Sequence, residues 1–281
     1  MRPVSLLSLT IRWAVLLVAW PLCAQISSGD DRYARLTPAE APVVLAQFRS
    51  SRLAADTCLK VTITHKPRRG EDSAPVPGLL WISWSDGGPR VRFEARDAQG
   101  RLTYAFLAKK NAQTSELWVA QNGQPAQAVK ELGLGSPLAP GLLLTPFDLH
   151  LPFTHWPQAE YLSTDRVVGR PAHTFLAKNP QAGAPAQVRF ALDRAYGAML
   201  SATSEDTRGK ALRSLQVEEF GKAGDQWLFA AISVRDEATR DVDLLQVTHA
   251  ALNLRIADGF FEPRTLDQPA NPPSDDQFKP L

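Results

Sequence analysis

Hydrophobic and polar residues alternate along most of this chain with the period of a β-strand. The alternation is clearest at 90–96, where Val91, Phe93 and Ala95 alternate with charged residues. A period of two is typical of a strand with one buried and one solvated face, so we expect the charged side chains of 90–96 to face solvent. The segments predicted to form strands are 58–64, 79–85, 90–96, 102–108, 117–121, 126–130, 166–168, 172–177, 188–192, 198–204, 212–220, 227–235 and 242–252.

The turns between these segments are short, and several have hairpin sequences such as Asp86-Gly87-Gly88 and Asn122-Gly123. Short turns favour an antiparallel meander over strands joined by crossing helices. A single sheet with so many strands curls strongly. The sequence therefore predicts a mainly β protein built as a barrel, an open half-barrel or a sandwich.

One apolar stretch, residues 140–175, separates the two runs of strands without showing a clean period of its own. Pro152 and Pro157 break any long helix in it, because proline lacks the amide N–H and clashes with the preceding turn. We expect a flap, or a pair of short helical turns, lying across the sheet. A second covering element is predicted at 37–55, where Thr37 and Glu40 have the spacing of a helix capping box.

The first 24 residues have the form of a secretory signal peptide. Arg2 and Arg12 give a basic start, an apolar run follows, and Ala24 offers a small residue at the cleavage position. The apolar run is shorter than the ~20 residues that span a bilayer. We therefore expect cleavage after Ala24, a linker at 25–36, one domain at 37–266 and a disordered proline-rich tail at 267–281, in a protein exported to the periplasm.

Charge and cysteine content argue against nucleic-acid binding and against an internal disulfide. The full chain has 31 basic and 29 acidic residues, and the predicted signal removes two arginines, so the remaining charges balance. Nucleic-acid binding usually requires a basic surface, which a balanced chain does not supply. Cleavage also removes Cys23 and leaves Cys58 as a predicted buried thiol without a disulfide partner.

Catalytic and metal-binding patterns do not stand out in the sequence. His150 and His155, with Asp148 nearby, make a metal site conceivable, but their spacing fits neither one helix face nor one strand face. Asp241 and Asp243 share a strand face, and we expect both to be solvated beside a turn. We predict neither an enzyme nor a cofactor-dependent or metal-dependent protein.

Aromatic residues are concentrated in the predicted strands and in the apolar stretch. A barrel with more than about eight strands can leave a cavity that side chains do not fill, and an apolar cavity would accept acyl chains. The ligand-binding residues that we predict are Trp81, Trp84, Phe93, Tyr104, Phe106, Trp118, Leu143, Phe147, Phe153, Trp156, Phe175, Phe190, Trp227 and Phe229.

Several short stretches resemble the outer-membrane lipoprotein-sorting proteins of the LolA/LolB-like superfamily. They are LTPAEAPVVLAQFRSSR, PFDLHLPFTHWPQAEYL, DRVVGRPAHTF and VRFALDRAYGAMLSATSED, within residues 36–266. The resemblance implies a single large antiparallel, incompletely closed β-barrel, with an N-terminal helix and a mid-chain flap over its concave face. It also implies a non-enzymatic protein that binds lipid or lipoprotein acyl chains and works with membrane-associated lipoprotein machinery. We expect the protein to be a monomer.

Two other functions remain open at this point. The same fold serves a periplasmic protein-binding or envelope-stress sensor module, and the exposed strand edges of an open barrel can accept another strand. A hydrolase that uses scattered histidine, aspartate and serine residues is the weaker alternative.

Overall fold

The computed structural model describes residues 31–51, 53, 55–110, 115–129 and 134–281. Contacts divide the chain into two units, Met1–Arg32 and Tyr33–Leu281, and the account below concerns the second unit. The predicted signal, 1–24, and the first part of the predicted linker, 25–30, lie outside the described residues.

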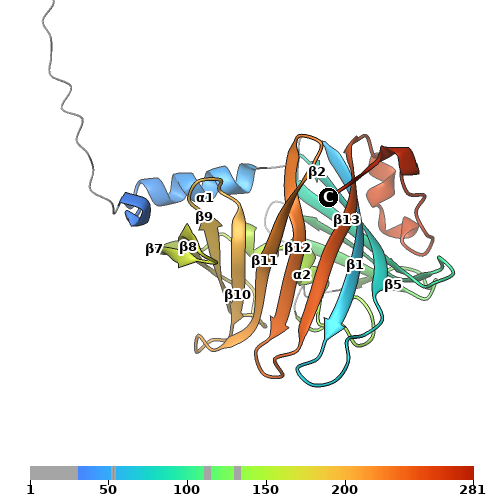
Figure 1. Cartoon of the computed structure of the whole chain (residues 1–281), viewed down its shortest axis with the longest axis horizontal. Coiled ribbons are helices and arrows are strands. Elements are labelled where there is room, and N and C mark those ends of the chain that lie inside the picture. The colour runs from blue at the N-terminus through green and yellow to red at the C-terminus, as the bar shows by residue number, and fades with distance from the viewer. Residues whose placement is uncertain (1–30, 52, 54, 111–114, 130–133) are drawn as a thin grey trace, which may run out of the picture. The chain divides into compact units, whose positions relative to one another are not determined.

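Within the described residues, fourteen strands form one antiparallel sheet (Figure 1). The strands are β1 (Asp56–Lys66), β2 (Val76–Ser85), β3 (Gly88–Arg96), β4 (Leu102–Lys110), β5 (Ser115–Gln121), β6 (Gln127–Val129), β7 (Ala159–Val167), β8 (Arg170–Lys178), β9 (Gln187–Asp193), β10 (Met199–Glu205), β11 (Ala211–Ala223), β12 (Gln226–Asp236), β13 (Val242–Leu254) and β14 (Phe278–Pro280). The helical elements are η1 (Asp31–Tyr33), α1 (Glu40–Ser50), α2 (Pro146–His150), η2 (Pro152–His155), η3 (Asp258–Phe261), η4 (Pro263–Thr265) and η5 (Asp275–Gln277).

The strand order explains why the sheet stays open. It runs β6-β5-β4-β3-β2-β1-β13-β12-β11-β10-β9-β8-β7, so β1 and β13 pair in the middle while β6 and β7 lie at opposite edges. The chain builds the first arm of the sheet outward from β1 to β6 and the second arm inward from β7 to β13. Among the described residues the two edge strands do not pair, which confirms the predicted half-barrel.

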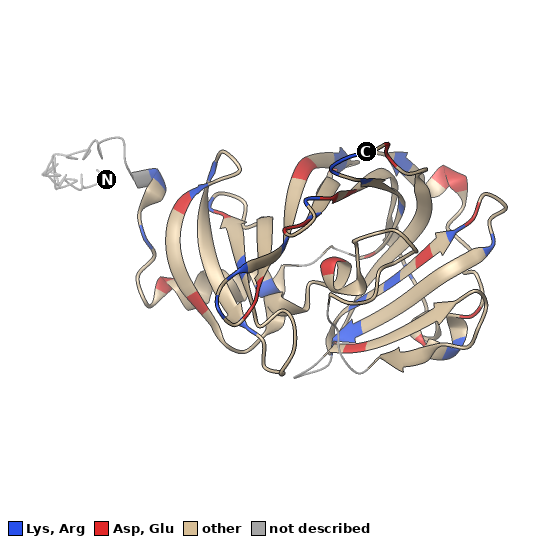
Figure 2. Ribbon diagram, turned by 90° about the horizontal axis from the view of Figure 1, so that it is seen from below, with Lys and Arg blue, Asp and Glu red and all other residues tan. Residues whose placement is uncertain are grey.

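Acidic and basic residues are interspersed along both arms of this sheet (Figure 2).

Strand β7 is longer than the sequence indicated, because residues 159–165, which we had placed in the apolar stretch, pair with β8. A register shift between Tyr161 and Ser163 accounts for the irregular sequence pattern there.

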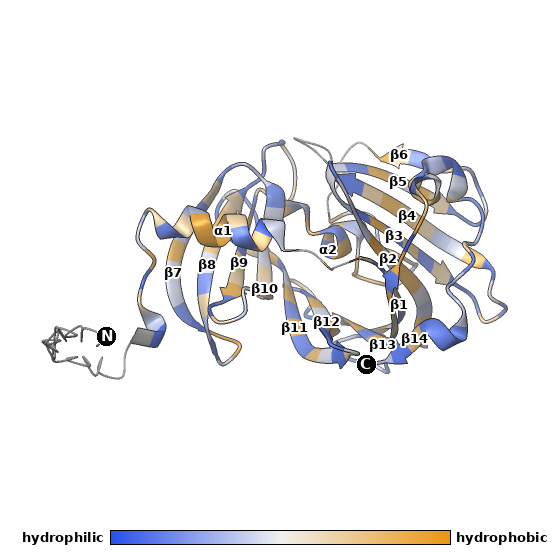
Figure 3. Cartoon of the chain, turned by 90° about the horizontal axis from the view of Figure 1, so that it is seen from above, coloured by the Kyte–Doolittle hydropathy of each residue, from blue (hydrophilic) through white to orange (hydrophobic). Residues whose placement is uncertain are grey.

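The connection from β6 to β7 has to travel from one edge of the sheet to the other. We call its described part, residues 134–158, the crossover. It forms α2 and η2, as predicted, with Pro146 in the first turn of α2 and Pro152 in that of η2. Leu151 joins them in a left-handed conformation with a φ of 51°. Figure 3 shows α2 inside the curve of the sheet, between the two arms.

Helix α1 covers the second arm. Thr37 and Glu40, the first residue of α1, form the predicted reciprocal hydrogen bonds, at 2.8 and 3.2 Å. The helix ends at Ser50, earlier than the predicted residue 55. Its buried Leu45 and half-buried Phe48 face the sheet, and the Phe48 ring lies 6.2 Å from the Phe190 ring of β9.

The opposite face of the first arm is covered by the C-terminal segment. Residues 258–280 form η3 to η5 and β14, which pairs with β13, and Phe261, Leu266 and Phe278 are buried there. The tail that we expected to be disordered is therefore ordered. Within that tail, Phe278 and the partly buried Ala270 pack in a second small core that contains Trp81 and Leu107.

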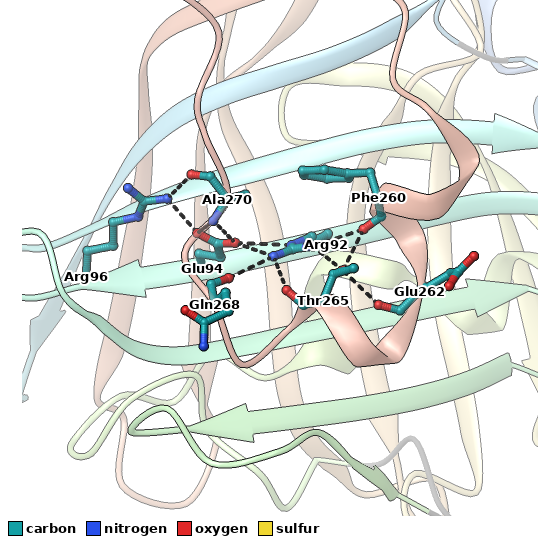
Figure 4. Close-up of polar contacts among 8 residues, drawn as sticks. All are labelled: Arg92, Glu94, Arg96, Phe260, Glu262, Thr265, Gln268 and Ala270. Carbon is teal, nitrogen blue, oxygen red and sulfur yellow. Dashed lines mark hydrogen bonds and ion pairs between the residues drawn. The ribbon is translucent and has the colours of Figure 1, made fainter.

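Charged residues of β3 are buried beneath this segment, contrary to the sequence expectation. Arg92 and Glu94 are 1% and 0% exposed. Glu94 accepts hydrogen bonds from Arg92 at 2.7 Å, from Arg96 at 2.7 Å and from the Ala270 N–H at 3.0 Å (Figure 4). Arg92 also donates to main-chain oxygens of the segment, so charge pairing replaces solvation.

Among the described residues, no helix is both long and apolar enough to cross a membrane.

Candidate functional site

The inner face of the curved sheet, together with the crossover and α1, forms one continuous apolar cluster. Strand alternation produces it: Leu59, Val61 and Ile63 of β1 point inward, whereas Cys58 points to the second core under the C-terminal segment. We call the side of the sheet that carries this cluster the inner face. It is where the sequence analysis places the ligand site.

Most of the predicted aromatic residues meet on the inner face. Phe153 of the crossover lies 5.6 Å from the Phe190 ring, and Phe190 lies 5.7 Å from Phe175. Phe147 of α2 contacts Phe153 at 5.9 Å and Trp156 at 6.2 Å. The predicted residues in this cluster are Phe93, Tyr104, Phe106, Phe147, Phe153, Trp156, Phe175, Phe190 and the half-buried Phe229.

The remaining predicted residues lie elsewhere. Trp81 and Trp118 point to the other side of the first arm and pack in the core under the C-terminal segment. Trp227 is 67% exposed. Trp84 is half-buried with its ring 6.3 Å from His155, and Leu143 is half-buried in the crossover.

A buried carboxylate fixes the middle of the crossover to the sheet. Asp243 of β13 is 0% exposed and accepts hydrogen bonds from the N–H groups of Leu143 and Leu144, at 2.6 and 2.8 Å. Its other oxygen lies 2.8 Å from Nδ1 of His65 on β1. The expectation that Asp243 is solvated is wrong, because the crossover covers it.

A second polar contact fixes the start of α2. Arg213 of β11 donates to Asp148 at 2.9 Å, and Asp148 also accepts from the Thr145 N–H and hydroxyl, at 2.9 and 2.8 Å. Asp148 therefore caps its own helix while it pairs with a strand, which satisfies a buried charge with several donors. Both side chains are at most one tenth exposed.

A third contact joins the crossover to α1. Arg49 donates to the carbonyl oxygens of Thr154 and Trp156, at 2.7 and 2.6 Å. The crossover thus rests on an apolar face, and polar contacts at Asp243, Arg213 and Arg49 are among those that hold it to other elements. We call these the three ties.

The two crossover histidines stay neutral at ordinary pH. Burial, together with the smaller effects of neighbouring His155 and Lys110, lowers the pKa of His150 to about 3. Burial and Lys110 lower the pKa of His155 to about 4. Among the described residues, no group of three or more histidine, cysteine or acidic side chains is placed to hold a metal ion.

Tyr104 is a polar group within the otherwise apolar inner face. It is 3% exposed, burial raises the pKa of its hydroxyl, and no described residue forms a hydrogen bond with that hydroxyl. A buried hydroxyl without a partner costs about 1–3 kcal/mol, so this position favours a ligand that carries an oxygen acceptor.

Sequence reasoning missed the role of Asp148 and Asp243 as ties, and it missed their partners. Asp243 stands within an alternating strand, and nothing local separates it from the partly exposed Asp241. The Thr145-Pro146 pair followed by Asp148 was a usable signal, because threonine, proline and an acidic residue at this spacing mark a helix start. The partners on β11 and β13 are far away in sequence and carry no such signal.

Comparisons with known proteins are consistent with this architecture. No family model matches the sequence, and no curated protein matches it significantly. A solved domain from Vibrio parahaemolyticus described as an outer membrane lipoprotein-sorting protein is similar with a TM-score of 0.70 and 15% identity, over 82% of this chain and 100% of that chain.

Two further structures share the architecture. A DUF1329 family protein from Desulfovibrio piger has a TM-score of 0.67 and 12% identity, over 81% of this chain and 96% of that chain. A LolA superfamily protein from Nitrosomonas europaea has a TM-score of 0.60 and 14% identity, over 79% of this chain and 97% of that chain. The chain therefore has the open half-barrel fold of LolA-superfamily and lipoprotein-sorting structures, as the sequence resemblance predicted.

Proposed function

We propose that this chain is exported by a cleaved signal peptide and binds acyl chains of lipids or lipoproteins on its inner face. The observation that carries the proposal is the arrangement of the crossover. Its aromatic side chains cover an apolar sheet face, and the three ties hold it there. An acyl chain would take the place of those side chains.

The net free energy of such an exchange should be small, so that the exchange is reversible. Each methylene of an acyl chain contributes roughly 0.8 kcal/mol when it is buried. Displacing the crossover exposes Phe147 and Phe153 and breaks one or more ties, so the net affinity is the difference between two terms of similar size. A carrier requires this balance, because it has to release its cargo.

Tyr104 would give the site its polar contact. Its hydroxyl lacks a partner among the described residues and would donate to an ester or carboxyl oxygen of the ligand. We expect Tyr104→Phe to weaken binding of a fatty acid by about fivefold, in line with the ~1 kcal/mol of one hydrogen bond. Binding of a plain hydrocarbon probe should not change.

In this proposal the protein catalyses no reaction. It acts in the periplasm as a monomeric carrier or receptor for acyl chains during lipoprotein sorting to the outer membrane. The likeness in fold to a lipoprotein-sorting domain from Vibrio parahaemolyticus supports this role.

The proposal is tested with protein exported to, and purified from, the periplasm. Native mass spectrometry should find co-purified lipid, and a fluorescent fatty acid should bind and be displaced by unlabelled fatty acid. Asp243→Asn weakens a tie and should increase the apparent affinity, whereas Asp241→Asn, just before the same strand and partly exposed, should not. Absence of both co-purified lipid and probe binding in all three proteins would refute acyl binding, and recovery of a single protein partner instead would favour a protein-binding module.

A further inference from the structure

Polar side chains gather at one end of the inner face, where strands of the first arm meet the crossover. Along β4, Phe106 and Ala108 belong to the inner face, so alternation places Lys110 on the same side. Its cross-strand partner is Ser115, the first residue of β5. The stem of Lys110 lies over Gly88 of β3, where an added Cβ would be 3.0 Å from the lysine Cδ.

Both histidines of the crossover lie at this end. Nε2 of His150 is 3.1 Å from the hydroxyl oxygen of Ser115, which pairs with Lys110. The ring centre of His155 is 6.3 Å from that of Trp84, near the end of β2. The crossover therefore brings two imidazole rings to the end of the strands that carries Lys110.

Arg49 approaches the same place from the last turn of α1, which lies beside the crossover (Figure 3). It donates to the carbonyl oxygens of Thr154 and Trp156, the residues on either side of His155. Its remaining N–H groups form no hydrogen bond with a described residue, so they stay available to an acceptor. We call the set of Arg49, Lys110, Ser115, His150 and His155 the basic end.

The positive charge of the basic end has no acidic counterpart. Besides burial, the groups that lower the pKa of His155 are Lys110 and Arg49, and no described acidic side chain raises it. Burial alone lowers the pKa of Arg49. Lys110 forms no ion pair with any residue that the structure describes. A partly buried positive charge without a carboxylate partner is unusual in proteins.

The acidic residues of the neighbouring strands do not supply that partner. Glu116 is the cross-strand partner of Lys109, whose ammonium lies 5.4 Å from the ring centre of Trp118 in the second core, on the other side of the sheet. Asp86 is exposed in the turn between β2 and β3 and pairs with no described residue. The sequence at 111–114, Asn-Ala-Gln-Thr, adds no charge.

A buried nitrogen at the basic end also lacks a hydrogen-bond partner. His150 is 5% exposed, and no described residue bonds to its Nδ1. When Nε2 accepts from the Ser115 hydroxyl, Nδ1 carries the proton of the neutral ring. A buried donor without an acceptor is destabilising, so this position favours an acceptor that the chain itself does not supply.

We propose that the basic end binds a phosphate-type oxyanion. Its donors come from β4, α1 and the crossover, and a tetrahedral oxyanion presents acceptor oxygens in several directions. The negative charge of the oxyanion would offset the charges of Lys110 and Arg49. Lysine and arginine are the side chains that most often bind phosphate in proteins.

This site is separate from the predicted contact of an acyl ligand with Tyr104. Lys110 lies at the other end of the same strand, and six residues of β-strand span about 20 Å. A carboxyl group bound at Tyr104 therefore does not occupy the basic end. The inference goes beyond acyl binding and does not depend on it.

The test titrates the exported protein with inorganic phosphate at constant ionic strength, in the absence of fatty acid, and follows binding by calorimetry. Phosphate should bind and raise the melting temperature, whereas chloride at the same ionic strength should do neither. In proton NMR spectra, the ring signals of His155, assigned with His155→Gln, should shift as phosphate binds.

Matched lysines separate the basic end from general electrostatic attraction. Lys110→Gln should weaken phosphate binding about tenfold, because a charge-assisted hydrogen bond is lost. Lys109→Gln removes the same charge from the adjacent residue, whose side chain lies on the other side of the sheet, and should leave the affinity unchanged. Melting temperatures without phosphate check that both variants are folded.

Free phosphate and the head group of a lipid can both supply such an oxyanion. Dioctanoyl phosphatidic acid, compared with dioctanoylglycerol, distinguishes the two sources. Binding of phosphatidic acid that depends on Lys110, without binding of inorganic phosphate, would identify the lipid head group. Binding of inorganic phosphate would show that the anion alone is sufficient, and either result supports the proposal.

Equal losses in the two lysine variants would overturn the proposal, as would the absence of binding of both phosphate compounds. Since the titrations with inorganic phosphate contain no acyl ligand, failure of the oxyanion site and failure of acyl binding are distinguishable.

Discussion

The Asp243 carboxylate shows how one buried charge can position a long apolar segment. Apolar contacts have no fixed geometry, so the aromatic residues of the crossover could pack on the inner face in several registers. Two main-chain N–H groups directed at one carboxylate, at 2.6 and 2.8 Å, select a single register. Nδ1 of His65 lies 2.8 Å from the other carboxylate oxygen, so the same side chain also joins β13 to β1.

Replacing this charge should therefore destabilise the fold. Asp243→Asn removes the charge and replaces one of the two acceptor oxygens by an amide NH₂ group, and we expect it to lower the free energy of unfolding by about 3 kcal/mol. Asp241→Asn, two residues away and partly exposed, should cost less than ~1 kcal/mol. Urea denaturation of both variants measures the difference, and equal losses would show that the Asp243 tie contributes nothing specific.

At the scale of elements, strands were predicted well and their burial less well. The alternation predicted the strand positions because one side of the sheet is apolar along both arms. The same alternation could not show that residues 258–270 cover the outer side of β3, where Arg92 and Glu94 are buried as a pair. A covering segment about 170 residues away leaves no mark on the local pattern.

The C-terminal segment should protect the Cys58 thiol. Cys58 is 0% exposed, and burial together with the nearby Glu94 charge raises its pKa, so it should react very slowly with a thiol reagent in native protein. Truncation after Ile256 removes Phe261, Leu266 and Phe278 from the second core and should speed the reaction by orders of magnitude. A Cys23→Ser background ensures that Cys58 alone is measured, and Glu94→Gln, which loosens the segment without removing it, should give an intermediate rate.

The crossover should make stability sensitive to mild acid. In the unfolded chain a histidine titrates near 6.5, whereas in the fold burial lowers the pKa of His150 to about 3 and that of His155 to about 4. Above pH 6.5 both histidines are neutral in both states and contribute no pH dependence. As the pH falls from 6.5 toward 4, the unfolded chain takes up protons that the folded chain does not, so the free energy of unfolding decreases.

Urea denaturation between pH 5 and 6.5 measures this effect, above the range in which carboxylates titrate. Each fully buried histidine can contribute about 1.4 kcal/mol per pH unit, and the partly exposed His155 contributes less. His173, whose pKa burial also lowers, adds to the slope. His150→Gln should therefore reduce the slope without abolishing it, while Ser115→Ala, which removes its hydrogen-bond partner at 3.1 Å, should leave the slope in place. An unchanged slope in His150→Gln would contradict the assignment.

At the scale of the whole molecule, local patterns predicted the antiparallel strands, the covering helix and the two short helical turns, whereas the open form of the sheet followed from the family resemblance. It could not predict which aromatic residues share the inner face. Trp118 and Phe106 both stand in alternating strands, yet they point to opposite sides of the sheet. The side is set by the register between strands and by which segment returns to cover each face, and both depend on contacts across the whole chain.

Mutations in the crossover and mutations in the sheet beneath it should change the apparent affinity for an acyl chain in opposite directions. If an acyl chain replaces the crossover on the inner face, apparent affinity equals intrinsic affinity multiplied by the fraction of molecules whose crossover is displaced. Phe153→Ala shortens a crossover side chain that is 2% exposed and so favours displacement. Phe190→Ala shortens its contact partner on the sheet, 5.6 Å away, and removes surface from the ligand as well.

We therefore expect tighter binding of a fluorescent fatty acid to Phe153→Ala and weaker binding to Phe190→Ala, although both lose about 3–5 kcal/mol of stability. Binding is measured at a temperature where circular dichroism shows both variants folded. The opposite signs matter, because general loosening of the core would change both affinities in the same direction. A decrease in both would show that the crossover is part of the ligand site, and not the element that gives way to the ligand.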